Sequence, residues 1–295
     1  MNGHPAGPPD IAASGALSLV LCADDYGMSP GISEAICRLL EAGRLSAASC
    51  MAIAEGWAAQ AGWLKPMAAR ADIGLHLTLT DHPPLGAMPA TAPDGRLPPL
   101  PALMRRALAR RLDRAEIAAE IGRQIDAFEA AFGAPPAFLD GHQHVHQLPV
   151  IRAAVLDALR NRLAGAAYVR VCWDSPWAIL RRGVAVPKTL LIAGLGLRFR
   201  RMVAAGGLPA NSRFRGVYGF GGDRPYAELF PVFLRNLVPG TLIMCHPGAP
   251  EAAPAMADPI AARRREEYAY LGSDAFLDAL QRSGARLRPY RRLAR

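Results

Sequence analysis

Short apolar runs alternate with amphipathic patterns along most of this chain. The runs have the length of buried strands and fall at residues 17–23, 45–51, 72–79, 137–140, 167–172 and 241–245. Between them apolar positions recur at helical spacing, as in Ile117, Ile121, Ile125 and Phe128. This alternation over 295 residues predicts an α/β fold with a parallel sheet, and its regularity favours a closed or irregular β/α barrel over an open sheet.

Local signals mark the ends of several predicted helices. Ser29-Pro30 offers an N-cap with proline at the first helical position. Asp113 and Glu116 resemble a capping box at the start of a helix that Gly133 ends. Further helices are expected at residues 57–70, 150–163 and 226–237, and after residue 258.

Three segments lie outside this alternation. Residues 1–15 are rich in Pro, Gly and Ala, and we expect a flexible tail followed by a single domain at 16–295. The stretches 82–103 and 173–218 are predicted to be long loops, which are usually functional or mobile. No apolar run approaches the ~20 residues that span a bilayer.

Composition narrows the cellular compartment and the binding partners that we expect for this protein. Five cysteines without paired spacing, in a chain that lacks a signal-like start, favour a reducing cytoplasm. The net charge of +9 comes from arginine, since lysine occurs only at Lys65 and Lys188. A basic surface attracts nucleic acid, anionic lipid or acidic substrates. Because no nucleic-acid motif accompanies the charge, we expect no nucleic-acid partner.

Polar side chains gather where the predicted strands end. Two adjacent acids, Asp24-Asp25, follow the first strand. Six of the seven histidines lie at or just beyond strand ends: His76, His82, His142, His144, His146 and His246. In α/β barrels the carboxyl ends of the strands carry the active site. The sequence therefore predicts one polar site to which four separate strands contribute side chains.

The residue types at this site point to metal chemistry. Two adjacent carboxylates repel each other unless a cation or a proton lies between them. The three imidazoles of segment 140–146 are costly to bury without partners. One carboxylate with two imidazoles suits Zn²⁺ or another divalent transition metal and leaves positions open for water and substrate. A free carboxylate can then accept a proton from metal-bound water that attacks an amide carbonyl, and a histidine opposite can protonate the leaving amine.

Four motifs together resemble those of the YdjC-like carbohydrate deacetylases, a family that includes chitooligosaccharide deacetylases and hopanoid-associated deacetylases. In chain order they are Leu21-Cys-Ala-Asp-Asp-Tyr-Gly-Met-Ser, Gly74-Leu-His-Leu-Thr, Leu139-Asp-Gly-His-Gln-His-Val-His and Met244-Cys-His-Pro-Gly. The resemblance covers roughly residues 17–290. It implies a distorted, incomplete β/α barrel related to polysaccharide deacetylases, which uses one divalent metal ion (Zn, Mg or another transition metal) to remove an N-acetyl group from a sugar.

The resemblance also assigns roles to individual positions. It makes Asp25, His76 and His142 the metal ligands and Asp24 the catalytic base. It makes His246 the acid or the stabiliser of the transition state.

Further positions take supporting roles by the same resemblance. Arg170 matches an arginine that orients the base, although Val171-Cys172 stand where a proline commonly follows. His144, His146 and Asp140 become contacts to the substrate or supports behind the ligands, which fix how ligands are oriented.

Three other functions use the same residues. A phosphoesterase would need a second metal and more bridging carboxylates than Asp24, Asp25 and Asp140 supply. A non-catalytic basic protein that binds nucleic acid or a lipid surface would not need every catalytic position filled. A non-haem iron oxygenase also binds its metal through two histidines and one carboxylate.

The substrate is predicted from the 173–218 segment alone. An apolar run at 189–197 is followed by a basic cluster at 198–202, and Arg213 and Arg215 would extend the same edge. One interpretation is a helix packed on the barrel with a solvated basic end. The other is an apolar, basic-edged surface for a lipid-linked sugar, in peripheral contact with the anionic inner face of a membrane. The partner is accordingly an N-acetylated oligosaccharide or glycolipid.

Overall fold

A parallel sheet organises the chain. The computed structural model describes residues 17–222, 224–250 and 258–292, so the predicted tail lies outside the described residues. Its eight described strands form one sheet in the order β5-β4-β3-β2-β1-β7-β6, with β8 paired to β1. Every pairing is parallel. The strands are β1 (Leu17–Tyr26), β2 (Ala47–Cys50), β3 (Asp72–Leu77), β4 (Phe138–Gly141), β5 (Tyr168–Val169), β6 (Arg213–Arg215), β7 (Thr241–Cys245) and β8 (Ala285–Leu287).

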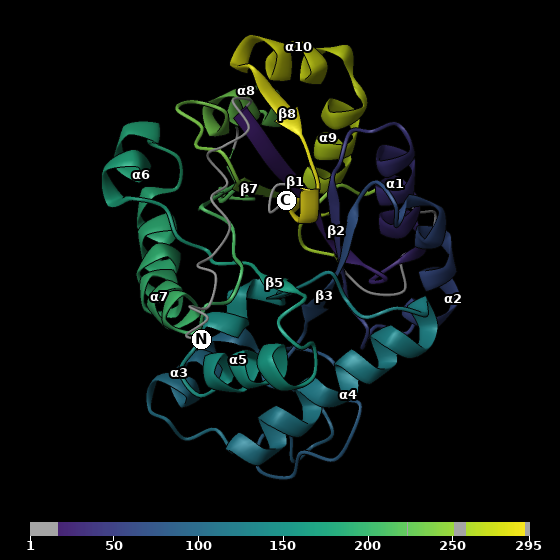
Figure 1. The fold of residues 1–295 in the computed structure, drawn as a ribbon, viewed down its shortest axis with the longest axis vertical. Helices are drawn as coiled ribbons and strands as arrows, with labels where there is room; N and C mark the ends of the chain where they lie inside the picture. The colour runs from purple at the N-terminus through teal and green to yellow at the C-terminus, as the bar shows by residue number, and fades with distance from the viewer. Residues whose placement is uncertain (1–16, 223, 251–257, 293–295) are drawn as a thin grey trace, which may run out of the picture.

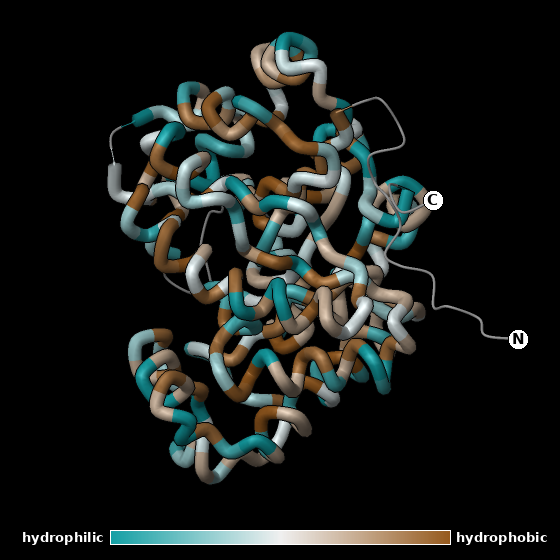
Figure 2. The backbone as a smooth tube through the Cα atoms, turned by 60° about the vertical axis from the view of Figure 1, so that its left-hand side comes forward, coloured by the Kyte–Doolittle hydropathy of each residue, from teal (hydrophilic) through white to brown (hydrophobic). Residues whose placement is uncertain are grey.

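Helices surround this sheet (Figure 1). They are α1 (Pro30–Glu41), α2 (Trp57–Gln60), α3 (Leu100–Leu108), α4 (Arg114–Phe132), α5 (Ile151–Asn161), α6 (Pro176–Arg182), α7 (Val186–Ala205), α8 (Tyr226–Phe233), α9 (Ala261–Gly272) and α10 (Asp274–Ser283). Short 3₁₀ helices occupy Ala61–Met67, His142–Gln147 and Tyr290–Arg292. In Figure 2 the helices alternate between hydrophobic and hydrophilic colours, as amphipathic helices do. None of them, within the described residues, is both long and apolar enough to cross a bilayer.

The predicted helix starts are confirmed, with one difference. Ser29 Oγ caps α1, and the Asp113 carboxylate accepts hydrogen bonds from two N–H groups of the first turn of α4. Glu116 does not close a capping box. Its carboxylate accepts the N–H groups of Ala90 and Thr91 instead, and so ties the 82–103 segment to α4.

The sheet curls until its two edge strands meet at a loose seam. Val169 of β5 pairs with Ala210, just before β6. The Asn211 side chain then accepts the N–H of Val171 at 2.7 Å and donates to its carbonyl at 3.0 Å. A side-chain amide thus replaces part of a regular strand pairing. The expected distorted, incomplete β/α barrel is confirmed.

Residues of β1 alternate between two cores. Leu19 and Leu21 belong to a large cluster that includes the helices, whereas Val20 and Cys22 belong to a smaller cluster built mainly from strand residues. The smaller cluster therefore fills the inside of the curled sheet. Asp24 follows Val20 and Cys22 in this alternation, which aims its carboxylate inward.

The two long segments are only partly loops, so that expectation is wrong. The first leads into α3, and the second contains α6, α7 and β6. Helix α7 lies close to the barrel because Gly196 approaches the Cys172 carbonyl, where an added Cβ would lie 2.5 Å from the oxygen. Glycine lowers helix propensity, which hides this helix from a pattern-based prediction.

Candidate active site

A break in β1 presents two carboxylates at the end of the strand. The register between β1 and β2 shifts between Ala23 and Tyr26, a bulge that contains both acids. Asp25 takes a left-handed backbone conformation with φ of 69°. Bulges re-aim side chains, and strained conformations of this kind cluster at functional sites. Here the bulge lets Asp24 and Asp25 serve two different groups of partners.

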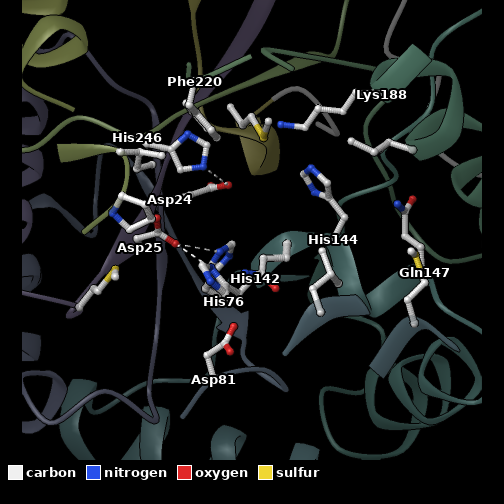
Figure 3. Close-up of a pocket in the computed structure, with 18 of the residues that line it drawn as sticks. Asp24, Asp25, His76, Asp81, His142, His144, Gln147, Lys188, Phe220 and His246 are labelled. Atoms are coloured by element: carbon white, nitrogen blue, oxygen red, sulfur yellow. Dashed lines mark hydrogen bonds and ion pairs between the residues drawn. The ribbon is translucent and has the colours of Figure 1, made fainter. Parts of the chain in front are cut away.

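Asp25 brings the two predicted histidine ligands together. Its Oδ1 lies 3.3 Å from His76 Nε2 and 3.0 Å from His142 Nδ1. The three ligand atoms lie within 4.8 Å of one another. Figure 3 shows the three side chains converging on one side of a cavity. The structure therefore places the predicted ligand set as a compact triad that faces open space.

Groups behind His76 fix the orientation of its ring. Asp140 Oδ1 lies 2.6 Å from His76 Nδ1, and Ser49 Oγ lies 2.9 Å from the same nitrogen. Burial disfavours the imidazolium of His76, but the charges of Asp140 and Asp24 outweigh it and raise its pKa to about 10. A carboxylate on the second nitrogen of a histidine is typical of metal sites, because it leaves the other nitrogen aimed at the cation.

Asp24 is bound by a buried arginine. Arg170 is fully buried, and its two terminal nitrogens contact the two Asp24 oxygens at 2.6 and 2.7 Å. Burial disfavours ionised Asp24, but the charge and hydrogen bonds of Arg170 outweigh it and hold the pKa of Asp24 below its ordinary value. Arg170 also contacts Asp140 Oδ2 at 2.6 Å, and so joins the predicted base to the support behind His76.

Arg264 of α9 contacts the triad through Asp25, a role that the sequence did not reveal. Its Nη2 donates to Asp25 Oδ2 at 2.7 Å, and its Nε donates to Asp258 at 2.6 Å. Burial opposes ionisation of Asp25, yet Arg264 and His142 hold its pKa well below the ordinary range. One Asp25 oxygen therefore faces arginine and the other faces the histidines.

His246 stands on the far side of Asp24 from the triad. Its Nε2 lies 4.0 Å from Asp24 Oδ2, and its ring packs edge-on against Phe220 at 5.4 Å. Burial lowers the pKa of His246 to about 4, so the ring is neutral near pH 7. The backbone N–H of His246 donates to Glu267 at 2.5 Å, and Glu267 also accepts the Tyr218 hydroxyl.

The two remaining histidines of the 142–146 run differ in their surroundings. His144 lines the cavity and packs edge-on against Phe214. His146 is fully buried, and its Nε2–H donates to the Arg170 carbonyl at 2.9 Å. His144 is therefore placed to touch a ligand, whereas His146 supports the backbone of the arginine.

A cavity of about 600 Å³ opens above these groups. The metal-site candidates lie on one side of it, and His144, Gln147 and Lys188 lie on the other (Figure 3). Much of the remaining wall is apolar and includes Leu100, Met104, Leu148, Leu191, Ile192, Leu195 and Phe220. The cavity thus has a polar floor at the strand ends and an apolar wall supplied largely by α3 and α7.

Fold and site together define a β/α-barrel protein in which a triad of one aspartate and two histidines adjoins an arginine-bound carboxylate. The chain belongs to the YdjC-like protein family, whose sequence model matches residues 18–282. It is 38% identical over 134 residues to a chitooligosaccharide deacetylase of Serratia marcescens, covering 45% of this chain and 52% of that protein. Identity to a chitooligosaccharide deacetylase of Yersinia pestis (strain Pestoides F) is 35% over 147 residues, covering 49% and 56%. The chain spans about half the length of these curated relatives.

A solved structure supports the fold over nearly the whole chain. It belongs to a candidate cellobiose-phosphate cleavage protein of Enterococcus faecalis V583. The TM-score is 0.71 at 17% sequence identity, with 94% of this chain and 99% of that chain covered. The likeness is one of architecture.

Proposed function

We propose that this protein is a metal-dependent hydrolase that removes an N-acetyl group from an N-acetylated sugar. The observation that carries the proposal is the Asp25, His76 and His142 triad beside Asp24, at the floor of a cavity large enough for a sugar. Identity to proteins named as deacetylases supports the same chemistry.

The donor set fits one divalent cation. A carboxylate oxygen and two imidazole nitrogens converge, and Asp140 and Ser49 hold the ring of His76 from behind. Nitrogen and oxygen ligands of this kind suit Zn²⁺ or a related divalent metal, with positions left open toward the cavity. The cation would supply Lewis acidity, which polarises a carbonyl and lowers the pKa of water.

The residues around the triad divide the proton transfers between them. Asp24, held ionised by Arg170, accepts a proton from the water whose oxygen bonds to the acetyl carbon. As the carbon–nitrogen bond breaks, the leaving nitrogen takes up one proton. His246 Nε2 lies 4.0 Å from Asp24 Oδ2, and would pass that proton on once substrate binding brings the two groups to hydrogen-bond distance. Acetate and a free amine result.

A two-metal phosphoesterase fits the site less well. Among the described residues, a second group of potential ligands consists of Cys22, Asp24 and Asp140. Arg170 lies within 3.1 Å of all three side chains. The guanidinium already pairs with both carboxylates, so a second cation would meet a like charge there.

The apolar wall of the cavity indicates the chemical nature of the substrate. A free oligosaccharide offers mainly hydroxyl groups, which gain little from Leu191, Ile192, Leu195 and Phe220. We propose that the N-acetylated sugar is joined to an apolar group that occupies this part of the cavity. A lipid-linked substrate of this kind would be met at an anionic membrane surface, in peripheral contact.

The proposal is tested by acetate release from a panel of N-acetylated oligosaccharides and glycolipids, with metal analysis of the same sample. We expect release that stops on chelation and returns with added divalent metal. Failure of every N-acetylated compound, with the metal loaded, would contradict the proposal. Oxygen consumption with Fe(II) or hydrolysis of a phosphodiester would then identify the alternative chemistry.

A further inference from the structure

Helices α6 and α7 form an arm along one edge of the molecule (Figure 1). We call residues 176–205 the α6–α7 arm. In the described part of the chain, four large apolar side chains are more than half exposed. Three of them belong to this arm: Trp177 at 69%, Leu180 at 51% and Leu191 at 59%. Apolar side chains concentrated on one structural unit indicate an interaction surface.

The arm is fastened firmly at its base. The buried Asp174 carboxylate contacts Arg182 at 2.7 Å, Arg213 at 3.4 Å and Arg215 at 3.3 Å. Arg215 also donates to the carbonyls of Phe233, Arg235 and Asn236. The expectation that Arg213 and Arg215 extend an outer basic edge is therefore wrong. They turn inward because a buried carboxylate and helix-end carbonyls need donors, and they hold the arm in place.

The arm remains strongly basic without these arginines. No Asp or Glu occurs from residue 175 to residue 222. Five cations of this stretch are exposed: Arg181, Lys188, Arg198, Arg200 and Arg201. Exposed tryptophan and leucine beside cations suit the boundary between lipid headgroups and acyl chains, where apolar burial and attraction to anionic lipid add together.

We propose that the α6–α7 arm docks on an anionic lipid surface, with Trp177 and Leu180 as its apolar anchors. These two residues stand three apart on α6 and so share one face of that helix. A second copy of this chain fits the arm less well, because a symmetric contact would bring two acid-free basic segments together.

The proposal deepens the proposed function and rests on it for the nature of the substrate. Leu191 and Lys188 are exposed and also line the cavity, so the cavity mouth opens beside the arm. A lipid-linked sugar can then enter the cavity while its apolar part stays near the membrane.

The test is co-sedimentation of the full chain with vesicles of phosphatidylcholine alone or mixed with phosphatidylglycerol. We expect binding to the anionic vesicles that weakens at high salt. Trp177→Ser with Leu180→Ser should lower the partition coefficient by about tenfold or more. Trp63→Ser is the matched control, because Trp63 is also exposed (46%) but lies outside the arm. For charge, Arg198→Glu should weaken binding, whereas Arg282→Glu on α10 should not.

Thermal melting and acetate release from a water-soluble N-acetyl sugar show whether each variant keeps its fold. Equal vesicle binding by the wild type and the Trp177, Leu180 double variant would overturn the proposal. So would an apolar-anchored dimer, seen as a change in sedimentation velocity without vesicles. Vesicle binding does not depend on turnover. If the protein fails to bind vesicles, the proposed deacetylase chemistry still stands. If it fails to release acetate, the vesicle experiment still tests the docking surface.

Discussion

The floor and the wall of the cavity are built in different ways. The floor comes from the ends of β1, β3, β4 and β7, where short motifs place charged groups against one another at 2.6 to 4.0 Å. Much of the wall comes from α3 and α7, which are largely apolar toward the cavity. The difference teaches that the barrel places the charged groups, whereas segments added to it shape the cavity in which a substrate would lie.

Among variants that keep the metal, removal of the base should give the largest effect, and it tests the floor alone. In Asp24→Asn we expect kcat to fall by at least ~100-fold, because an amide cannot accept the proton. The metal should stay bound, since Asp25, His76 and His142 are untouched. Steady-state kinetics with elemental analysis measures both quantities. Loss of metal from this variant, with retention in Asp25→Asn, would exchange the two roles.

His246→Ala, a second change in the floor, should lower activity less than Asp24→Asn does. A residue that passes a proton to the leaving nitrogen acts mainly in the transition state, so kcat should fall more than KM rises. We expect a loss of about tenfold to 100-fold in kcat. Measurement of kcat and KM for one N-acetylated substrate distinguishes a role in the transition state from a role in binding. An unchanged kcat with a raised KM would make His246 a binding residue.

Changing the wall should alter substrate choice and leave the chemistry intact. Leu195→Ser removes an apolar contact to the lipid part, so KM for an N-acetyl glycolipid should rise by about tenfold. KM for the matching free sugar should change less than about twofold, since the sugar meets the floor. Leu197→Ser, on the same helix but outside the cavity lining, is the control. A parallel rise for both substrates would remove the distinction between floor and wall.

The smallest effect concerns a buried acid behind the floor. Burial raises the pKa of Glu267 to about 7 from an ordinary 4.5. The folded state therefore holds more protons on this group than the unfolded state between these pH values. Its contribution to stability is full below about pH 4.5 and is lost as pH rises through about 7.

Glu267→Gln should therefore gain in melting temperature relative to the wild type as pH rises from 5 to 8. The difference between the two proteins isolates this group from the other acids. A constant difference across the range would show that Glu267 ionises in the folded protein as it does in water.

Much of the floor could be predicted from the sequence, because strand ends and local motifs are visible in it. Asp24, Asp25 and His142 follow apolar runs directly, and parallel strands bring their carboxyl ends to one edge. Ser49 and Arg264 could not be found this way. Ser49 lies inside a short strand, and Arg264 lies on α9, 239 positions after Asp25. Their roles depend on tertiary packing.

The wall was harder to predict for a physical reason. Helix α7 contains two glycines, Gly194 and Gly196, residues that weaken helical propensity. Its helix forms through packing, since Gly196 and Phe199 are buried against the barrel. The sequence showed an apolar run at 189–197 followed by a basic cluster at 198–202. Only the fold shows that part of it lines the cavity.

The most direct test of the account is metal content and acetate release in His142→Ala. The wild type should bind about one divalent metal per chain, and chelation should abolish acetate release. His142→Ala should lose the metal, because one of three protein ligands is gone, and acetate release should be lost with it. Full metal content and full activity in that variant would contradict the assignment of the triad, and with it the proposed function.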